Sequence, residues 1–88
     1  MRIEFDADKR ERTLAERGLD FADAATVFTG RQITFEDVRR GYGEPRWITI
    51  GELGARMVVI VWTPRGEVRR IISMRKANER EQAVYDLG

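Results

Sequence analysis

The segment Val68–Lys76 holds the side chains of this chain that are best suited to chemistry. Its cations are Arg69, Arg70, Arg75 and Lys76. Guanidinium groups bind phosphate oxygens bidentately and stay charged near neutral pH, so this segment indicates a site for a phosphodiester. The 88-residue chain has no His and no Cys, which removes the commonest general base, the thiolate nucleophile and the usual zinc ligands. Any reaction must therefore use Arg, Lys, carboxylates, hydroxyls or backbone groups.

Alternation along this segment predicts which side chains share a face of a sheet. One face holds Arg69, Ile71, Ser73 and Arg75, and the other holds Val68, Arg70, Ile72 and Met74. Arg70 is an exception on an otherwise apolar face, and Arg46 is a similar exception in an earlier strand. The two arginines suggest a shared anion site. The alternative is that they end in ion pairs with Glu44, Glu67 or Glu81, since buried charges are paired.

Cleavage of an RNA phosphodiester requires a base for the 2′-hydroxyl, an acid for the leaving 5′-oxygen, and stabilisation of the extra negative charge on phosphorus. Arginine suits only the last of these tasks. For proton transfer the sequence offers Lys9, Glu44, Glu81 and Tyr85 as candidates. Glu81 and Tyr85 lie one turn apart on a predicted C-terminal helix, and we expect both to face the sheet edge near Arg70 or Arg75. The alternative for each is a surface or packing role.

Length and charge narrow the class of protein further. The length predicts a single domain, residues 1–88, and the net charge of the chain is only +1. Residues 1–45 hold 8 Lys/Arg against 10 Asp/Glu, whereas residues 46–88 hold 8 against 5. This local basic excess suits a phosphate-sized site better than a broad nucleic-acid footprint. We expect no metal, no cofactor and no membrane segment or signal peptide, and therefore a cytoplasmic protein.

The N-terminal half is predicted to contain one strand and two helices. Arg2–Phe5 alternates as a strand, and a helix capped by Asp6 follows to about Arg17. A second helix begins after Asp20 and packs on the core through residues at helical spacing. These core residues are Phe21, Ala24, Ala25 and Phe28.

The C-terminal half is predicted to form an antiparallel meander and a final helix. Glu36–Pro45 is a polar, Gly-rich loop, and Thr63–Gly66 is a tight turn between the last two strands. The three strands are Arg46–Ile50, Met57–Trp62 and Val68–Met74. A capping box at Asn78 begins the last helix, in which Val84 and Leu87 are expected to pack inward. The predicted fold class is α+β, with helices against a mainly antiparallel sheet.

Several stretches of the chain together resemble the BrnT family of toxins from bacterial type II toxin–antitoxin systems. The stretches are Phe5–Lys9, Gly18–Ala24, Glu44–Gly51 and Arg70–Ala77, followed by Glu81 and Tyr85. The resemblance implies a RelE-like ribonuclease fold and metal-independent RNA cleavage that inhibits translation. It also implies a hetero-oligomer with a BrnA-type antitoxin, through which the toxin meets operator DNA only indirectly. By position, the family's basic and polar signature falls on Lys9, Arg46, Arg70, Ser73, Arg75 and Tyr85.

The chain departs from the common family pattern where relatives carry histidine. It has Glu16-Arg17-Gly18 in place of a Lys-His-Gly segment, and Trp62 where a His is sometimes seen. Arg17 replaces only the charge, because arginine does not shuttle protons near neutral pH. Our leading hypothesis has Arg46, Arg70 and Arg75 hold the scissile phosphate, with Lys9, Glu81 or Tyr85 in proton transfer. The alternative is a non-enzymatic module that docks a DNA-binding antitoxin and acts in operon autoregulation.

Overall fold

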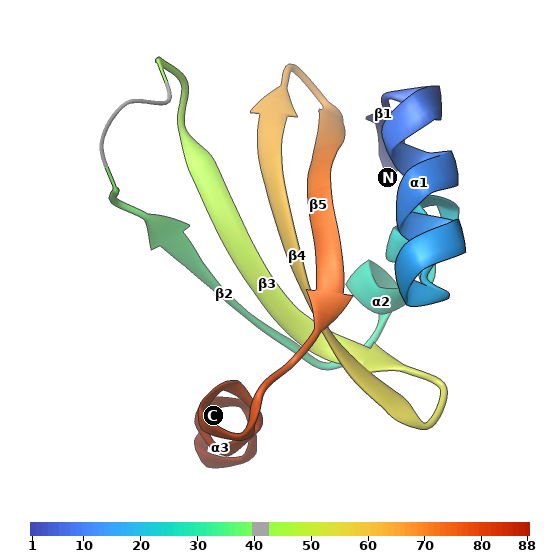
Figure 1. Cartoon of the computed structure of the whole chain (residues 1–88). Coiled ribbons are helices and arrows are strands. Elements are labelled where there is room, and N and C mark those ends of the chain that lie inside the picture. The colour runs from blue at the N-terminus through green and yellow to red at the C-terminus, as the bar shows by residue number, and fades with distance from the viewer. Residues whose placement is uncertain (40–42) are drawn as a thin grey trace.

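A five-stranded sheet in the order β1-β5-β4-β3-β2 forms the centre of the computed structural model, which describes residues 1–39 and 43–88 (Figure 1). The strands are β1 Arg2–Phe5, β2 Gln32–Asp37, β3 Arg46–Leu53, β4 Arg56–Arg65 and β5 Val68–Lys76. From β2 to β5 the strands form an antiparallel meander, while β1 pairs with β5 in parallel. The predicted α+β class with a mainly antiparallel sheet is confirmed.

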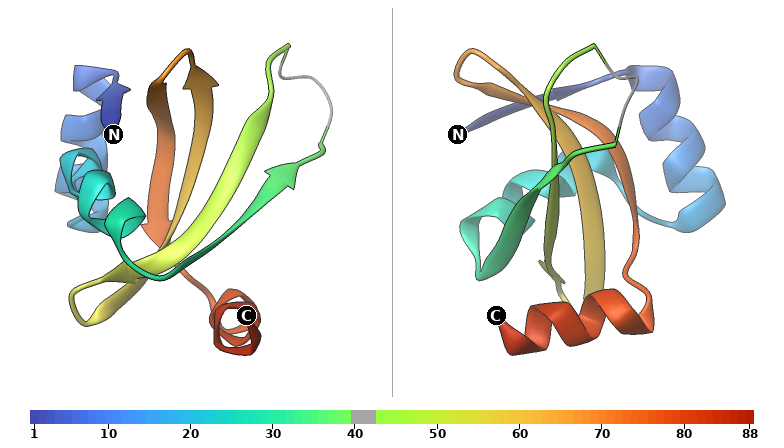
Figure 2. Two further views of the ribbon diagram at one scale, coloured as in Figure 1. Left: turned by 180° about the vertical axis from the view of Figure 1, so that it is seen from behind. Right: turned by 90° about the vertical axis from the view of Figure 1, so that its left-hand side faces the viewer.

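The helices lie at two places around this sheet. They are α1 Ala7–Arg17, the 3₁₀ helix η1 Phe21–Asp23, α2 Ala24–Thr29 and α3 Glu79–Leu87. The first three gather beside β1 and β5, and α3 lies across the opposite end of the molecule (Figures 1 and 2). The side chains of Asp6 and Asn78 cap α1 and α3 as predicted. None of the helices in the described part of the chain has the length and apolar character needed to cross a membrane.

The two faces of the sheet differ in what covers them. One face, called the covered face below, packs against η1 and α2 to form the main hydrophobic core. This core includes Phe21, Val27, Phe28, Val58, Ile60, Trp62, Ile71 and Met74. On the other face, called the open face, a smaller cluster of Ile50, Val59, Ala77 and Tyr85 forms where α3 crosses one end of the sheet. The other end of the open face is the region where a ligand can reach the strands.

A β-bulge in β5 changes which of its side chains share a face. Val61 is paired with Ser73, but the next residue of β4 is paired with Ile71, so Ile72 is an extra residue without a direct partner. As a result, Ile71 and Met74 both enter the main core although they are three positions apart. The predicted separation of Arg70 and Arg75 onto opposite faces is therefore wrong. The alternation reverses at the bulge, which places Arg70, Ser73 and Arg75 together on the open face.

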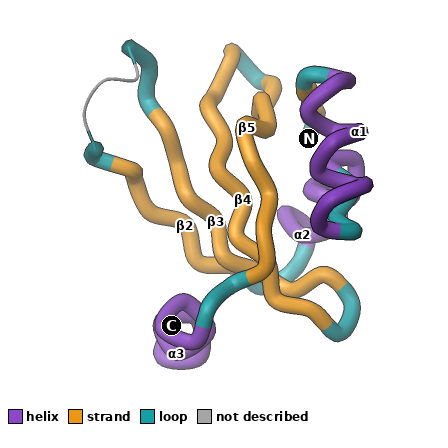
Figure 3. The backbone as a smooth tube through the Cα atoms, in the orientation of Figure 1, coloured by secondary structure: helices purple, strands orange, loops and turns teal. Residues whose placement is uncertain are grey.

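The turn between β4 and β5 lies further along the chain than predicted. Pro64 belongs to β4, where it is paired with Arg69, and the turn forms at Gly66, whose φ of +61° favours glycine. Proline is tolerated there because β3 begins at Arg46, so the missing N–H of Pro64 faces no partner strand on that side. Figure 3 shows the resulting short hairpin turns, in teal, between β3 and β4 and between β4 and β5.

Two further expectations about the C-terminal half need correction. Val84 and Leu87 do not pack inward: they are 43% and 89% exposed, and Tyr85 at 2% is the buried residue of α3. The helix therefore docks through a different face from the one predicted. The expected loop begins later than predicted, since Glu36 and Asp37 extend β2, and its residues 40–42 lie outside the described residues.

Candidate active site

A row of polar side chains crosses the open face of the sheet, one from each strand. Asp37 is paired with Arg46, the register of β3 with β4 places Arg46 beside Thr63, and Arg70 lies between Thr63 and Glu4. Directly opposite residues of neighbouring strands point to the same face. This arginine row consists of Asp37, Arg46, Thr63, Arg70 and Glu4. The two arginines that the sequence singled out therefore flank one shared neighbour.

Both arginines of the row have a carboxylate nearby. Glu4 Oε1 lies 3.8 Å from Arg70 Nη1, and Glu44 Oε2 lies 4.0 Å from Arg46 Nε. The alternative of an ion pair is thus found for Arg46 with Glu44, whereas Arg70 pairs with Glu4 rather than with Glu67 or Glu81. The Arg70 contact is longer than a hydrogen bond, and its side chain is 30% exposed. Its guanidinium group is therefore open to an additional anion.

Thr63, which lies between these two arginines, holds the start of the strand that carries Arg46. It is only 1% exposed, and its hydroxyl donates a hydrogen bond of 2.6 Å to the carbonyl oxygen of Pro45. Because Pro45 precedes Arg46, this bond fixes the start of β3 against β4. Neighbouring strands lie about 4.8 Å apart, so the backbones of Arg46 and Arg70 are separated by roughly 10 Å. Two extended arginine side chains can converge on one phosphate group across that span.

Further charged side chains surround the row. Asp37 is almost completely buried and receives two hydrogen bonds from the Arg39 guanidinium group, at 2.9 and 2.7 Å. Arg65 lies 3.4 Å from Glu44. Among the described residues, four arginines accompany three carboxylates here: Arg39, Arg46, Arg65 and Arg70 with Glu4, Asp37 and Glu44. Their formal excess of +1 equals the net charge of the whole chain, here concentrated on one region of the sheet.

Arg75 shares the open face with the row but is bound to α3. Its guanidinium group donates hydrogen bonds of 2.7 and 2.6 Å to the two carboxylate oxygens of Glu81. These bonds lower the pKa of Glu81 below its usual range. Arg75 is paired with Val59, four residues from Thr63 along β4 and hence roughly 13 Å away. The expected approach of Glu81 to Arg75 is found, and it forms a site separate from the row.

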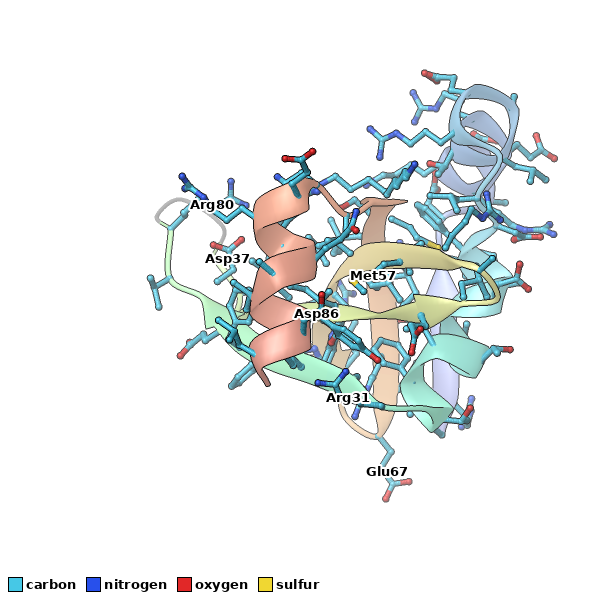
Figure 4. All side chains as sticks on the ribbon, turned by 90° about the horizontal axis from the view of Figure 1, so that it is seen from below. Arg31, Asp37, Met57, Glu67, Arg80 and Asp86 are labelled. Carbon is cyan, nitrogen blue, oxygen red and sulfur yellow. The ribbon has the colours of Figure 1, made fainter. Side chains whose placement is uncertain are left out.

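The Tyr85 hydroxyl points in another direction from the one predicted. It donates a hydrogen bond of 2.9 Å to Glu52, near the β3–β4 turn. The Arg31 guanidinium group lies 4.1 Å from the centre of the Tyr85 ring and donates a 2.7 Å hydrogen bond to its backbone carbonyl. Figure 4 shows Arg31 beside the C-terminal end of α3. These contacts attach α3 to the sheet, and they direct the hydroxyl away from Arg70.

Lys9 and Ser73 complete the set of residues expected from the sequence. Lys9 is on α1, where its side chain lines a shallow surface depression with Thr13 and Glu16. It is not part of the arginine row. Ser73 is paired with Val61 and lies on the open face between the positions of Arg70 and Arg75. The structure therefore brings together Arg46 and Arg70, and separately Arg75 and Glu81.

The sequence pattern does not indicate Thr63 or Glu4 as members of the site. It predicts Thr63 in a turn and Glu4 in a short strand whose partner it does not specify. The alternation of Glu4 with the core residues Ile3 and Phe5 does place it on the open face. Its position beside Arg70 depends on the parallel pairing of β1 with β5, which no local sequence signal indicates.

These features define a small α+β protein with an arginine row on an open sheet face, a surface that suits phosphate groups. A family model described as "Ribonuclease toxin, BrnT, of type II toxin-antitoxin system" matches residues 5–81. Because the match covers most of the chain, this chain belongs to the BrnT family, and the resemblance found in the sequence is confirmed. A search of curated proteins found no match. Family membership implies ribonuclease activity and an antitoxin protein as a partner.

Proposed function

We propose that this chain is an endoribonuclease toxin in which Arg46 and Arg70 bind the scissile phosphate of RNA. The observation that carries the proposal is the arginine row, with both guanidinium groups on one face and flanking Thr63. Cleavage through the 2′-hydroxyl places extra negative charge on the phosphate oxygens in the transition state. A preorganised donor aimed at such charge contributes about 10²- to 10³-fold in rate.

The wider proposal follows from the family. The toxin cleaves RNA without a metal ion, inhibits translation in the cytoplasm and is neutralised by a BrnA-type antitoxin. The complex forms a hetero-oligomer and meets operator DNA through the antitoxin. We further propose that the sheet and helices form a RelE-like fold.

The other residues expected in the site from the sequence have less structural support for a catalytic role than Arg46 and Arg70. Arg75 and Glu81 form a bidentate pair, which supports a role in holding α3 beside the open face rather than in binding the scissile phosphate. Lys9 and the Tyr85 hydroxyl lie outside the row, so a role in proton transfer would require the substrate to extend to them. The phosphate site itself rests on Arg46 and Arg70.

The test is an RNA cleavage assay with the purified chain in buffer containing EDTA. The wild-type chain should cut a single-stranded RNA, and Arg70→Ala should reduce the rate by about 10²- to 10³-fold. Arg12→Ala is the matched control, since it removes the same charge from the exposed surface of α1. Intact RNA with the wild-type chain, together with tight antitoxin binding, would instead support the non-enzymatic docking module.

A further inference from the structure

We propose that Glu4 is the general base that takes the proton from the attacking 2′-hydroxyl, an inference that rests on the proposed ribonuclease function. Glu4 occupies the end of the arginine row in β1 and is directly paired with Arg70. Its carboxylate lies 3.8 Å from the Arg70 guanidinium group. A base in this position lies beside a phosphate held by Arg70, which is where the 2′-oxygen must approach.

Exposure and bonding leave the Glu4 carboxylate available for a proton. Its side chain is 43% exposed, and within the described residues its one polar contact is the loose pair with Arg70. Glu4 is therefore ready to accept a proton without first breaking a hydrogen bond.

The other carboxylates around the row are already engaged. Asp37 is almost completely buried and receives two hydrogen bonds from Arg39. Glu44 lies between two cations, 3.4 Å from Arg65 and 4.0 Å from Arg46. Among the described carboxylates near the row, Glu4 alone combines exposure, a single loose partner and a position next to a proposed phosphate ligand.

The chemical step is balanced by these groups and by solvent. The Glu4 carboxylate takes the 2′-hydroxyl proton while the 2′-oxygen forms a bond to phosphorus. Arg46 and Arg70 stabilise the charge on the phosphate oxygens as the bond from phosphorus to the 5′-oxygen breaks. The leaving 5′-oxygen takes a proton from a solvent water molecule, and the protonated Glu4 returns its proton to solvent. The products are a 2′,3′-cyclic phosphate and a 5′-hydroxyl end.

The charge of Glu4 allows binding and catalysis to be separated. Substitution Glu4→Gln keeps the shape of the side chain but removes its negative charge and its ability to accept a proton. Cleavage under single-turnover conditions should fall by about 10²- to 10⁴-fold. Binding of a 2′-O-methyl RNA, which cannot be cleaved, should stay unchanged or become tighter because one negative charge beside Arg70 has gone.

Glu67→Gln provides the matched control, because Glu67 lies in the exposed β4–β5 turn and points away from the sheet (Figure 4). This variant should cleave like the wild-type chain. Thermal unfolding of both variants checks that each remains folded.

The outcomes distinguish the inference from the function on which it rests. If Glu4→Gln cleaves at the wild-type rate while Arg70→Ala is inactive, the general base is another residue and the ribonuclease site stands. In that case, a loss of cleavage of the expected size in Lys9→Met, Glu81→Gln or Tyr85→Phe, with binding of the 2′-O-methyl RNA retained, would assign the role to that residue. If Arg70→Ala also cleaves at the wild-type rate, the proposed function itself is wrong.

Discussion

Arg69 and Arg70 are consecutive residues of β5, yet they belong to two regions with opposite environments. On the covered face, the Arg69 guanidinium group lies 4.5 Å from the centre of the Phe28 ring and 4.3 Å from that of Trp62. Burial lowers the pKa of Arg69, and its cation is stabilised by the aromatic rings. On the open face, Arg70 has one loose carboxylate partner. Two neighbouring arginines thus differ: Arg69 packs against the aromatic rings of the core, and Arg70 is open to a ligand.

The contrast between Arg69 and Arg70 indicates that the role of an arginine in this fold depends on the face of the sheet that it occupies. The covered face uses aromatic rings and apolar side chains to satisfy a cation that is partly removed from water. On the open face, the guanidinium groups lie beside a threonine and beside carboxylates that are too distant for a hydrogen bond. An anion can therefore bind to these guanidinium groups. Changes on the open face should therefore alter cleavage, and changes on the covered face should alter stability.

Among residues that position the site without touching the phosphate, the largest effect is expected at Thr63. Thr63→Val removes the hydrogen bond to Pro45 and lets the start of β3, with Arg46, shift against β4. Displacement of a catalytic group by about 1 Å can cost about 10²-fold in rate. Single-turnover cleavage should fall toward that value, while Thr63→Ser, which keeps the hydroxyl, should retain most of the activity. Equal rates for the two variants would remove Thr63 from the site.

A smaller effect, and one of the opposite kind, is expected at Arg69. Arg69→Ala should lower the free energy of unfolding by about 2 kcal/mol, because it removes a cation held between two aromatic rings. The measurement is urea unfolding followed by tryptophan fluorescence. Cleavage by the folded protein should stay at the wild-type rate. A large loss of cleavage without a loss of stability would contradict the claim that residues of the covered face act on stability alone.

Substitutions at the end of the open face that α3 covers should lower stability rather than cleavage, as substitutions in the core should. Tyr85→Phe removes the hydrogen bond to Glu52 and should cost about 1 kcal/mol of stability. The expected readout is faster amide hydrogen exchange within α3, since the ring and the Arg31 contact remain. If the variant loses cleavage while exchange in α3 is unchanged, the hydroxyl acts in the reaction rather than in docking.

The smallest effect concerns the attachment of α1 and depends on pH. Hydrogen bonds from Arg10 and from the Ala22 N–H hold the pKa of Asp20 at about 2. Because the pKa of an unfolded Asp is about 3.9, this stabilisation is present above about pH 4 and is lost as the pH falls through about 2. Asp20→Asn should therefore melt below the wild-type chain at pH 6, and the difference should shrink as the pH is lowered from about 4 to below 2. A difference in melting temperature that stays the same across this range would contradict the assignment.

Local sequence patterns predicted the elements of this fold better than their contacts. The helix caps at Asp6 and Asn78 and the apolar central strand were readable because each depends on neighbouring residues. The bulge at Ile72 has no local signal, and it reversed the predicted faces of Arg75 and Ser73. The sequence predicted the arginines of the candidate site but not the residues beside them. Thr63 and Glu4 lie next to Arg70 only because of strand pairing.

A double-mutant cycle on cleavage tests whether Arg46 and Arg70 bind one phosphate. Arg46→Ala and Arg70→Ala should each reduce the single-turnover rate by about 10²- to 10³-fold. Two groups that act as a unit give strongly non-additive losses, so the double variant should be little slower than either single variant. If the two losses instead multiply, the arginines act at separate places and the shared phosphate site is contradicted.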